Sequence, residues 1–414
     1  MLLQPVRPPG NGDRQLRGRR HHHPRLHRHS PVRGGPVIGD NPWLDGLLRL
    51  LVIAVAIPLA VIVLNYLERK VIGRVQNRLG PMRVGPYGTL QAVADTIKLL
   101  TKEDVRPHSA DRWTFELAPY VVVVPSVVAL VTLPLTEDLF VRNLALGLFF
   151  ILAVSTLSIV GLVMAGWGSD NKYAILGAMR SAAQLISYEI PLVMAAVAVA
   201  MVAHTPDGRG TLDLVQIVDG QGRVPYIVWQ PLAFLIFTVA ALAELYRQPF
   251  DIPVAESEVV GGPFVEYSGM RWAMFMMAEY VNLVLLSALT AIVFLGGWNW
   301  PLGNEVGPAL QVPLMAVKTA IFILFFFWAR AILPRLRIDQ LMAYSWQVLL
   351  PLAFYQIIAN GLVLVYDWPD VVLGVLSGAG AMAAIFLTYR MARRPAPVRR
   401  PVAVAATSMR EVKV

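Results

Sequence analysis

The sequence predicts an all-α integral membrane protein: a bundle of about nine transmembrane helices with an amphipathic interfacial helix and long cytoplasmic loops. Of the 414 residues, 56% are hydrophobic and only 15% are charged, and the mean hydropathy is +0.56. A soluble globular domain is about 25% charged. The deficit therefore indicates membrane spans of roughly 20 apolar residues each.

The nine predicted spans follow one another from residue 44 to residue 389. The fourth begins with a polar segment. The spans are Leu44–Leu67, Phe115–Leu135, Leu144–Gly166, Ala174–Ala203, Ile227–Tyr246, Trp272–Gly296, Leu310–Leu333, Trp346–Tyr366 and Val371–Tyr389.

Loop charge predicts the orientation of these spans, because cytoplasmic loops carry an excess of Lys and Arg. Cations concentrate after spans one, three, five, seven and nine, and the alternate loops are poor in them. We therefore expect a multi-pass membrane protein with the basic loops and the C-terminus in the cytoplasm. The 36 Lys and Arg residues thus set orientation, and no nucleic-acid partner is expected.

The two ends of the chain differ from the predicted membrane domain, residues 43–391. Residues 1–42 form a basic tail of Arg, His, Pro and Gly that we expect to be disordered, and residues 392–414 form a basic C-terminal tail. An odd number of spans would place the N-terminal tail outside, against the charge rule. We therefore expect that this tail is absent from the mature protein, rather than translocated despite its charge. Five histidines in it could bind a metal ion, but a biased tail or a mis-assigned start explains them better: His21, His22, His23, His27 and His29.

The chain contains no cysteine. It cannot by itself hold an iron–sulfur cluster, a thiolate zinc site or a disulfide. No Gly-rich phosphate loop follows a predicted strand, and no metal-ligand set is present outside the histidine tail. Nucleotide, flavin and metal chemistry are therefore not expected on this chain.

The segment between the first two spans contains a short amphipathic pattern. Between Leu90 and Leu100, apolar residues recur at helical spacing, while Asp95 and Lys98 occupy other faces. The segment is too short and too polar to span, so it predicts a helix lying at the membrane interface. A surface helix with only a packing role remains an alternative.

The segment Ala243–Tyr280 is the most informative one, because it carries six acids between and within apolar runs. A charged group in a bilayer is costly, so intramembrane carboxylates usually mark ion paths or ligand sites. A salt bridge to Arg247 could explain Glu244, and a solvated loop could explain the acids after Pro249. Glu279 lies well inside span six and favours a buried functional role. The six acids are Glu244, Asp251, Glu256, Glu258, Glu266 and Glu279.

The fourth span carries a further acid. Gln184, Ser187 and Tyr188 share one helix face, which a helix–helix hydrogen-bond cluster would explain. Glu189 follows, and Pro191 can kink the helix so that polar groups meet inside the bundle. Burial and neighbouring negative charge both raise the pKa of a carboxyl group, so clustered acids exchange protons near neutral pH.

Four segments resemble one family closely and in the same order. They are Glu68–Glu103 (ERKVIGRVQNRLGPMRVGPYGTLQAVADTIKLLTKE), Gly166–Ile190 (GWGSDNKYAILGAMRSAAQLISYEI), Ala243–Gly269 (AELYRQPFDIPVAESEVVGGPFVEYSG) and Ala278–Tyr280 (AEY). This pattern resembles the NuoH-type subunit, the quinone-site membrane subunit of proton-pumping NADH:quinone oxidoreductase, respiratory complex I. The resemblance covers roughly Leu44 to Val365.

The resemblance implies a part in the quinone tunnel and in the acidic path that links quinone reduction to proton translocation. It implies quinone as substrate, with FMN and iron–sulfur clusters only in partner subunits. It implies as partners the other membrane-arm and hydrophilic-arm subunits, with membrane lipid around them; alone, the chain should have no dehydrogenase activity. The proton-coupling residues would be Glu68, Asp95, Glu189, Glu244, Asp251, Glu256, Glu258, Glu266 and Glu279, and the tunnel residues Arg69, Arg78, Arg83, Arg247, Phe250 and Tyr267.

Some positions depart from the family pattern. Met82 stands where Asn is usual, and Val254 stands where an acid is usual, so the acidic loop is one carboxylate short. Gln248, Pro263 and Phe264 also differ from the commoner residues.

Two other classes of protein stay open. One is a homologous subunit of a membrane-bound hydrogenase or other donor:quinone oxidoreductase. The other is an independent secondary transporter, although the sequence does not show the paired interrupted repeats of a transporter.

Overall fold

The computed structural model describes residues 42–137, 140–205, 208–222, 224–252, 254, 256–299 and 307–392. Apart from Pro42 and Ala392, which are helix ends, the two predicted tails and the histidine cluster lie outside the described residues. The described part is built from helices with one two-residue hairpin, β1 (His204–Thr205) against β2 (Gly208–Arg209).

The helices follow one another with short connections over most of the chain. They are α1 (Pro42–Val75), α2 (Gln91–Thr101), α3 (Arg112–Val131), α4 (Gly147–Ser155), α5 (Leu157–Gly168), α6 (Lys172–Val202), α7 (Leu214–Asp219), α8 (Tyr226–Trp229), α9 (Pro231–Glu244), α10 (Glu256–Val259), α11 (Gly269–Leu295), α12 (Pro308–Ile332), α13 (Ile338–Tyr344), α14 (Leu350–Val365) and α15 (Asp370–Ala392). Short 3-10 turns are η1 (Pro86–Gly88) and η2 (Gly262–Phe264), and a π-helical segment, η3 (Ser345–Leu349), joins α13 to α14.

The all-α membrane class is confirmed. Among the described residues, seven helical stretches are long and apolar enough to cross a membrane, and they coincide with the second, third, fourth, sixth, seventh, eighth and ninth predicted spans. The first predicted span lies within α1. The fifth coincides with α9, an apolar helix of 14 residues. The predicted interfacial helix is α2, which begins one residue later than expected.

Three predicted spans depart locally from a regular α-helix. The third divides at Thr156 between α4 and α5, and the eighth contains η3. The fifth divides at Gln230, where Pro231 begins α9. Proline has no N–H to donate to the preceding turn, which is why it suits the first position of a helix and breaks a longer one.

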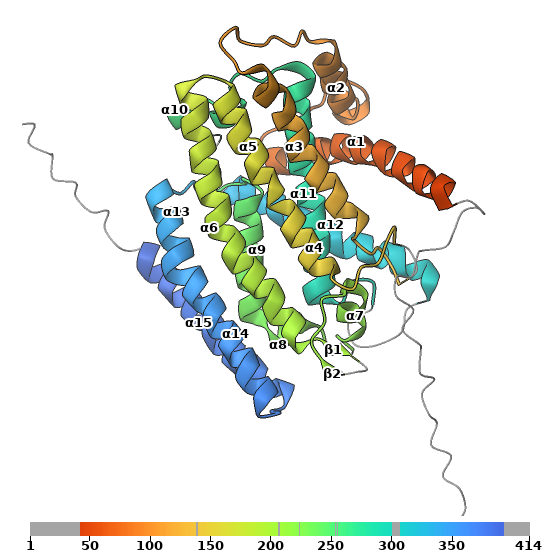
Figure 1. Ribbon diagram of the computed structural model, residues 1–414, viewed down its shortest axis with the longest axis vertical. Coiled ribbons are helices and arrows are strands. Elements are labelled where there is room, and N and C mark those ends of the chain that lie inside the picture. The colour runs from red at the N-terminus through yellow and green to blue at the C-terminus, as the bar shows by residue number, and fades with distance from the viewer. Residues whose placement is uncertain are drawn as a thin grey trace, which may run out of the picture.

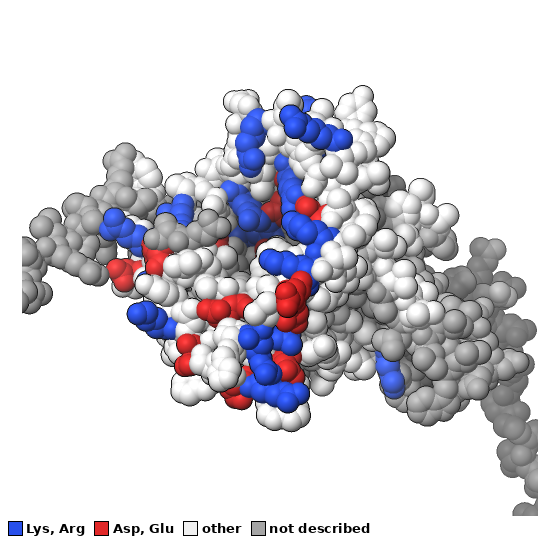
Figure 2. Space-filling model, turned by 90° about the horizontal axis from the view of Figure 1, so that it is seen from above, with Lys and Arg blue, Asp and Glu red and all other residues white. Residues whose placement is uncertain are grey.

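The helices α3, α5, α6 and α9 pack side by side, and α14 with α15 packs against α6 and α9 (Figure 1). The helix α11 packs between α3 and α12, and α1 crosses α11 and α12 at a steep tilt (Figure 1). The largest buried apolar cluster joins α6, α9, α11, α12 and α14. Polar loops, α2 and α10 lie together at one end, where Lys, Arg, Asp and Glu side chains surround a hollow (Figure 2).

Close approach of α5 to α6 depends on a glycine. A Cβ atom built on Gly166 would lie 2.3 Å from the Cβ of Ala178 and 2.7 Å from the carbonyl oxygen of Ala174. Small residues allow such approach between membrane helices, where packing rather than hydrophobic burial drives association. By contrast, a Cβ on Gly361 in α14 would meet nothing within 4 Å.

We expect Gly166→Ala to destabilise the protein by about 1–3 kcal/mol, because the added methyl group forces α5 away from α6. Gly361→Ala is the matched control, and it should be neutral or stabilise by up to about 1 kcal/mol. The thermal midpoint of the purified assembly measures both. Equal midpoints for the two variants would contradict the packing described here.

Candidate functional site

A buried ionic cluster lies where α1, α11, α12 and the loop after α9 meet. The carboxylate of Glu68, whose residue is 3% exposed, accepts hydrogen bonds from the guanidinium groups of Arg247 and Arg330. The Tyr280 hydroxyl donates to the other oxygen of Glu68 at 2.9 Å. Nη2 of Arg247 lies 3.0 Å from Oε1 of Glu279. Arg247 therefore contacts two carboxylates from two different helices.

The local structure explains why these groups meet. Arg247 follows the end of α9, Glu279 and Tyr280 are neighbours on α11, and Arg330 lies in the last turn of α12. The guanidinium of Arg247 also lies over the rings of Tyr280 and Phe327, at 5.2 and 5.9 Å from their centroids. Removing ions from water is expensive, and only good geometry with further hydrogen bonds offsets that cost. Glu68 receives three such hydrogen bonds, whereas Nε and Nη2 of Arg247 have no hydrogen-bond partner.

A cavity of about 860 Å³ opens beside this cluster, between α1, α2, α11 and the end of α12. Most of its lining is apolar, with a methionine-rich wall on α11 that includes Met270, Met274 and Met277. Its polar lining includes Glu68, Arg69, Arg78, Asp95, Lys98, Tyr280 and Arg330. Small-molecule sites have this character: concave, mostly apolar, and with a few convergent polar groups.

One edge of the cavity carries an ion pair between α1 and α2. Nη1 of Arg69 lies 2.7 Å from Oδ2 of Asp95, and Nζ of Lys98 lies 3.7 Å from Oδ1. Gln91 also donates to Asp95, at 3.3 Å. The predicted tunnel residue Arg69 and the predicted coupling residue Asp95 are therefore partners of each other.

Further inside the bundle, several polar atoms are buried without a hydrogen-bond partner. They include Oε1 of Glu189 on α6, the hydroxyl of Tyr246 and Oδ1 of Asn282 on α11. Glu244 interacts electrostatically with Glu189, and Tyr246 does so with Glu244 and Glu279. These groups thus extend from the ionic cluster towards α6. The expected alternative of a salt bridge between Glu244 and Arg247 is not found, because Arg247 pairs with Glu68 and Glu279.

Comparison with known proteins assigns the chain to a family. Residues 48–361 match the family described as NADH dehydrogenase. The H subunit of NADH-quinone oxidoreductase from Geobacillus kaustophilus is 50% identical over 297 residues, which are 72% of this chain and 87% of that protein. The protein of the same name from Brevibacillus brevis is 46% identical over 302 residues, which are 73% of this chain and 88% of that protein. The protein of the same name from Dehalococcoides mccartyi is 41% identical over 336 residues, which are 81% of this chain and 91% of that protein.

The chain belongs to the family of the H subunit of NADH-quinone oxidoreductase. It is a membrane subunit of the NADH:quinone oxidoreductase complex, respiratory complex I, and the complex is an enzyme. The relatives' names favour this class over the hydrogenase subunit and the secondary transporter that the sequence left open.

Some residues that the sequence predicted for the site have other surroundings in this protein. Glu258 pairs with Arg180 at 2.7 Å, on the exposed side of α10. Glu266 accepts a hydrogen bond of 2.6 Å from Asn171, at the start of α6. Both contacts join the acidic loop to α6, away from the cavity lining. Asp251 is half-buried and interacts electrostatically with Glu279, and the side chain of Glu256 lies outside the described part of the chain.

Two of the predicted tunnel residues are aromatic and buried in packing. Tyr267 stacks on Phe115 with 4.2 Å between centroids, and its hydroxyl donates to the Phe115 carbonyl at 3.1 Å. Burial raises the pKa of the Tyr267 phenol. Phe250 packs against Tyr188, with 5.2 Å between ring centroids, and its carbonyl accepts from Gln184 at 2.8 Å. Neither residue lines the cavity.

The remaining predicted cations lie in the loop between α1 and α2. Arg78 lines the cavity, and its Nε donates to Gln76 at 2.8 Å. Arg83 is exposed and is not among the cavity-lining residues. Of the six predicted tunnel residues, the structure therefore places Arg69 and Arg78 at the cavity and Arg247 behind Glu68.

Sequence reasoning missed Arg330, Tyr280 and Tyr246 as site residues. Arg330 ends an apolar span, where a cation is expected for orientation alone, so nothing in the sequence distinguished it. Tyr280 follows Glu279 directly in the AEY segment, which was a usable signal.

At the opposite end of the molecule, burial, with smaller contributions from Glu137 and Asp213, raises the pKa of Asp219 to about 6. That group was also not singled out.

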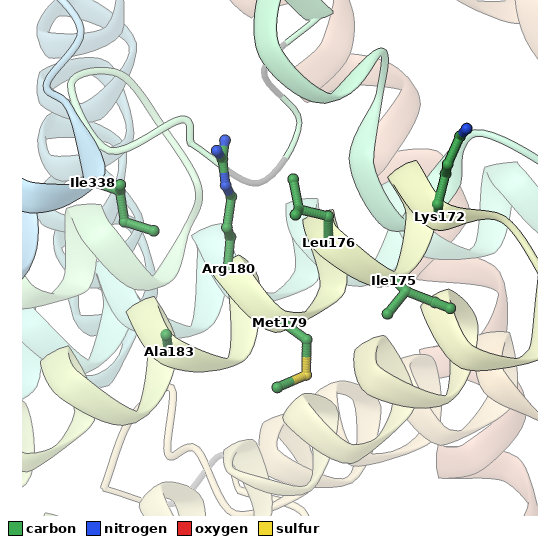
Figure 3. Close-up of a pocket in the computed structure, with 7 residues that line it drawn as sticks. All are labelled: Lys172, Ile175, Leu176, Met179, Arg180, Ala183 and Ile338. Atoms are coloured by element: carbon green, nitrogen blue, oxygen red, sulfur yellow. The ribbon is translucent and has the colours of Figure 1, made fainter. Parts of the chain in front are cut away.

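A second concavity lies on α6 and is separate from the ionic cluster. It is a shallow groove of about 470 Å³ beside Ile338 of α13. Lys172 and Arg180 point to one side of α6, while Met179 points to the other (Figure 3). None of the acids proposed for proton coupling lines this groove. It is therefore distinct from the candidate site.

We expect Arg247→Met to destabilise the protein by about 3–5 kcal/mol, because it leaves two carboxylates without their shared partner. Arg106→Met is the matched control: Arg106 pairs with Glu116 at 3.1 Å, but both side chains are more than a third exposed. Its cost should be about 0–1 kcal/mol. Yield and thermal midpoint of the assembled complex measure the difference, and similar losses in both variants would count against the buried cluster.

Proposed function

We propose that the cavity beside α1 and α11 is part of the quinone-binding tunnel, and that the buried acids couple quinone reduction to proton translocation. One observation carries this proposal. Glu68 lines the cavity, and Arg247 links Glu68 to Glu279 on α11. A change of charge in the cavity would therefore act on Glu68, and through the guanidinium of Arg247 on Glu279.

The cavity has the chemistry that a quinone requires. Its apolar walls suit an isoprenoid tail and an aromatic ring, and the flexible methionines of α11 can adapt to both. Arg69, Tyr280 and Arg330 supply donors that could bind the quinone carbonyl oxygens. Reduction of a quinone to a quinol consumes two electrons and two protons, so negative charge develops at these oxygens before protonation.

The ionic cluster would respond to that charge. Negative charge in the cavity weakens the hold of Glu68 on Arg247 and Arg330 by competing for them. Arg247 can then interact more strongly with Glu279, which changes the proton affinity of Glu279. The Tyr246 hydroxyl and the carboxyl groups of Glu244 and Glu189 continue this series towards α6. We assign the coupling path to Glu68, Glu279, Glu244 and Glu189, with Asp251 beside it.

The other predicted acids have a different role in this proposal. Glu258 and Glu266 are engaged by Arg180 and Asn171, so we assign them to fixing the acidic loop on α6. Asp95 orients Arg69 at the edge of the cavity. Val254 removes one acid from the loop, but the path assigned here does not pass through that position.

Electron entry takes place elsewhere in the complex. The chain has no cysteine to hold a cluster, so we place the FMN and iron–sulfur clusters in partner subunits. The partners are the other membrane-arm and hydrophilic-arm subunits. We place the protein in the bacterial plasma membrane with its basic loops and C-terminus in the cytoplasm, which is the face that carries α2, α10 and the charged hollow (Figure 2).

Glu279→Gln and Glu189→Gln should each reduce the rate of proton pumping by tenfold or more, which corresponds to an increase of about 1.4 kcal/mol in the activation free energy. The complex should still assemble. The amide is nearly isosteric but cannot carry a proton between two states. Pumping is measured as dye quenching in proteoliposomes, alongside NADH:quinone turnover. Glu116→Gln, at an exposed ion pair on α3, is the control. Normal pumping in both path variants would rule out the proposed coupling.

Arg69→Ala should raise the apparent KM for quinone by about tenfold, because it removes a donor from the cavity edge and releases Asp95. Arg112→Ala changes an exposed arginine on α3 that pairs with Glu116 at 3.7 Å, and it should leave quinone kinetics unchanged. Steady-state assays with a soluble short-chain quinone separate KM from kcat. An unaltered KM in the Arg69 variant would exclude Arg69 from the tunnel.

A further inference from the structure

Lys318 is a buried cation in the middle of α12, and the coupling path does not use it. The residue is 5% exposed, although α12 qualifies as a membrane span. Its ammonium donates three hydrogen bonds to backbone carbonyls: 2.6 Å to Leu295, 2.7 Å to Gly297 and 2.6 Å to Asn299. All three N–H groups are thereby satisfied. Within the described part of the chain, no carboxylate lies at salt-bridge distance from it.

The three carbonyls converge because of how α11 ends. The last carbonyls of a helix have no partner within that helix and carry the negative end of its dipole. Gly296 and Gly297 have φ of 71° and 48°, the left-handed region that glycine adopts without strain, so the chain turns back over the helix end. The oxygens of residues 295, 297 and 299 then face one ammonium. A positive charge is therefore fixed at this end of α11.

The same helix carries a series of polar side chains that leads from the ionic cluster towards Lys318. They are Glu279, Asn282, Ser287 and Thr290. At about 100° per residue these positions fall within about 140° of one another, so they occupy one side of α11. Ser287 and Thr290 are fully buried, and both Oδ1 of Asn282 and Oγ of Ser287 lack a hydrogen-bond partner. We call these four residues the polar seam.

The seam has a physical consequence for a membrane that stores a proton gradient. The seam runs over 11 residues from Glu279 to Thr290, or roughly 17 Å, and the carbonyl of Leu295 at the Lys318 ammonium lies a further five residues, or roughly 8 Å, along the helix. Buried polar atoms without partners attract water, and water bridging such atoms conducts protons. A seam open at both ends would therefore dissipate the gradient. Fixed positive charge is an established barrier to protons and cations in membrane pores.

We propose that Lys318 seals the polar seam of α11, so that its caged ammonium blocks passive proton flow between Glu279 and the opposite face of the membrane. The seal acts whether or not quinone is being reduced. It needs only that protons reach the Glu279 end of the seam, and it does not depend on the coupling role of Glu279 proposed above.

The experiment measures passive proton flow through the resting complex. Wild-type and variant complexes are reconstituted into liposomes that contain a pH-sensitive dye, and a potassium diffusion potential drives protons without NADH or quinone. Lys318→Met should raise the passive proton conductance by about tenfold. Lys318→Arg keeps the charge and should stay within about twofold of wild type.

A double variant separates flow through the seam from general loosening of the bundle. Adding Glu279→Gln to Lys318→Met removes the proton-carrying group at the other end of the seam, and the conductance should return to the wild-type level. NADH:quinone turnover of the same preparations verifies assembly. Lys318→Gln is the second neutral variant, because its amide still donates to the carbonyls and maintains the end of α11.

The outcomes are distinct. Raised conductance in either neutral variant, suppressed by Glu279→Gln, supports the seal. Wild-type conductance in both neutral variants, in assembled complexes, overturns it, and so does a leak that persists in the double variant. A leak in Lys318→Met together with normal pumping in Glu279→Gln alone would refute the coupling proposal but not the seal.

Discussion

The structure depends on one buried contact, the carboxylate of Glu68 held between Arg247 and Arg330. This contact joins α1, the loop after α9 and the end of α12, and Tyr280 adds α11. Each charge alone would be too costly to bury, but together they satisfy one another. Glu68, Tyr280 and Arg330 of this contact also line the cavity. The ionic contacts of Glu68 thus hold this part of the cavity wall in place, and they also expose it to any change of charge in the cavity.

The arrangement separates the acids into two kinds. Glu68 accepts hydrogen bonds from two guanidinium groups, and Glu279 lies 3.0 Å from one of them. Glu189 has a buried oxygen without a partner, and its electrostatic neighbour is another acid, Glu244. Like charges close together and out of water favour binding of a proton. The acids near the cavity therefore have cations beside them, whereas those nearer α6 have each other.

Sequence patterns predicted the fold better than the contacts of the site. Apolar run length located the long helices, because the bilayer fixes that length, and helical spacing located α2. The same patterns did not locate the breaks at Thr156 and Gln230, although Pro231 is a local signal for the second. For the site, residue type identified Glu68, Arg247 and Glu279, but not which cation each acid contacts. Arg330 lies 262 residues from Glu68, and no local pattern encodes such a contact.

The helix α12 shows how one apolar segment can serve two electrostatic purposes. Arg330 lies in its last turn, and Lys318 lies 12 residues earlier, or roughly 18 Å along the axis. Arg330 is matched by a carboxylate that lines the cavity, so its interaction can change with the charge there. Lys318 is matched only by backbone dipoles, which do not titrate. A carboxylate partner can gain or lose a proton, whereas backbone carbonyls cannot, so the two cations of one helix are held in ways that respond differently to a change of charge.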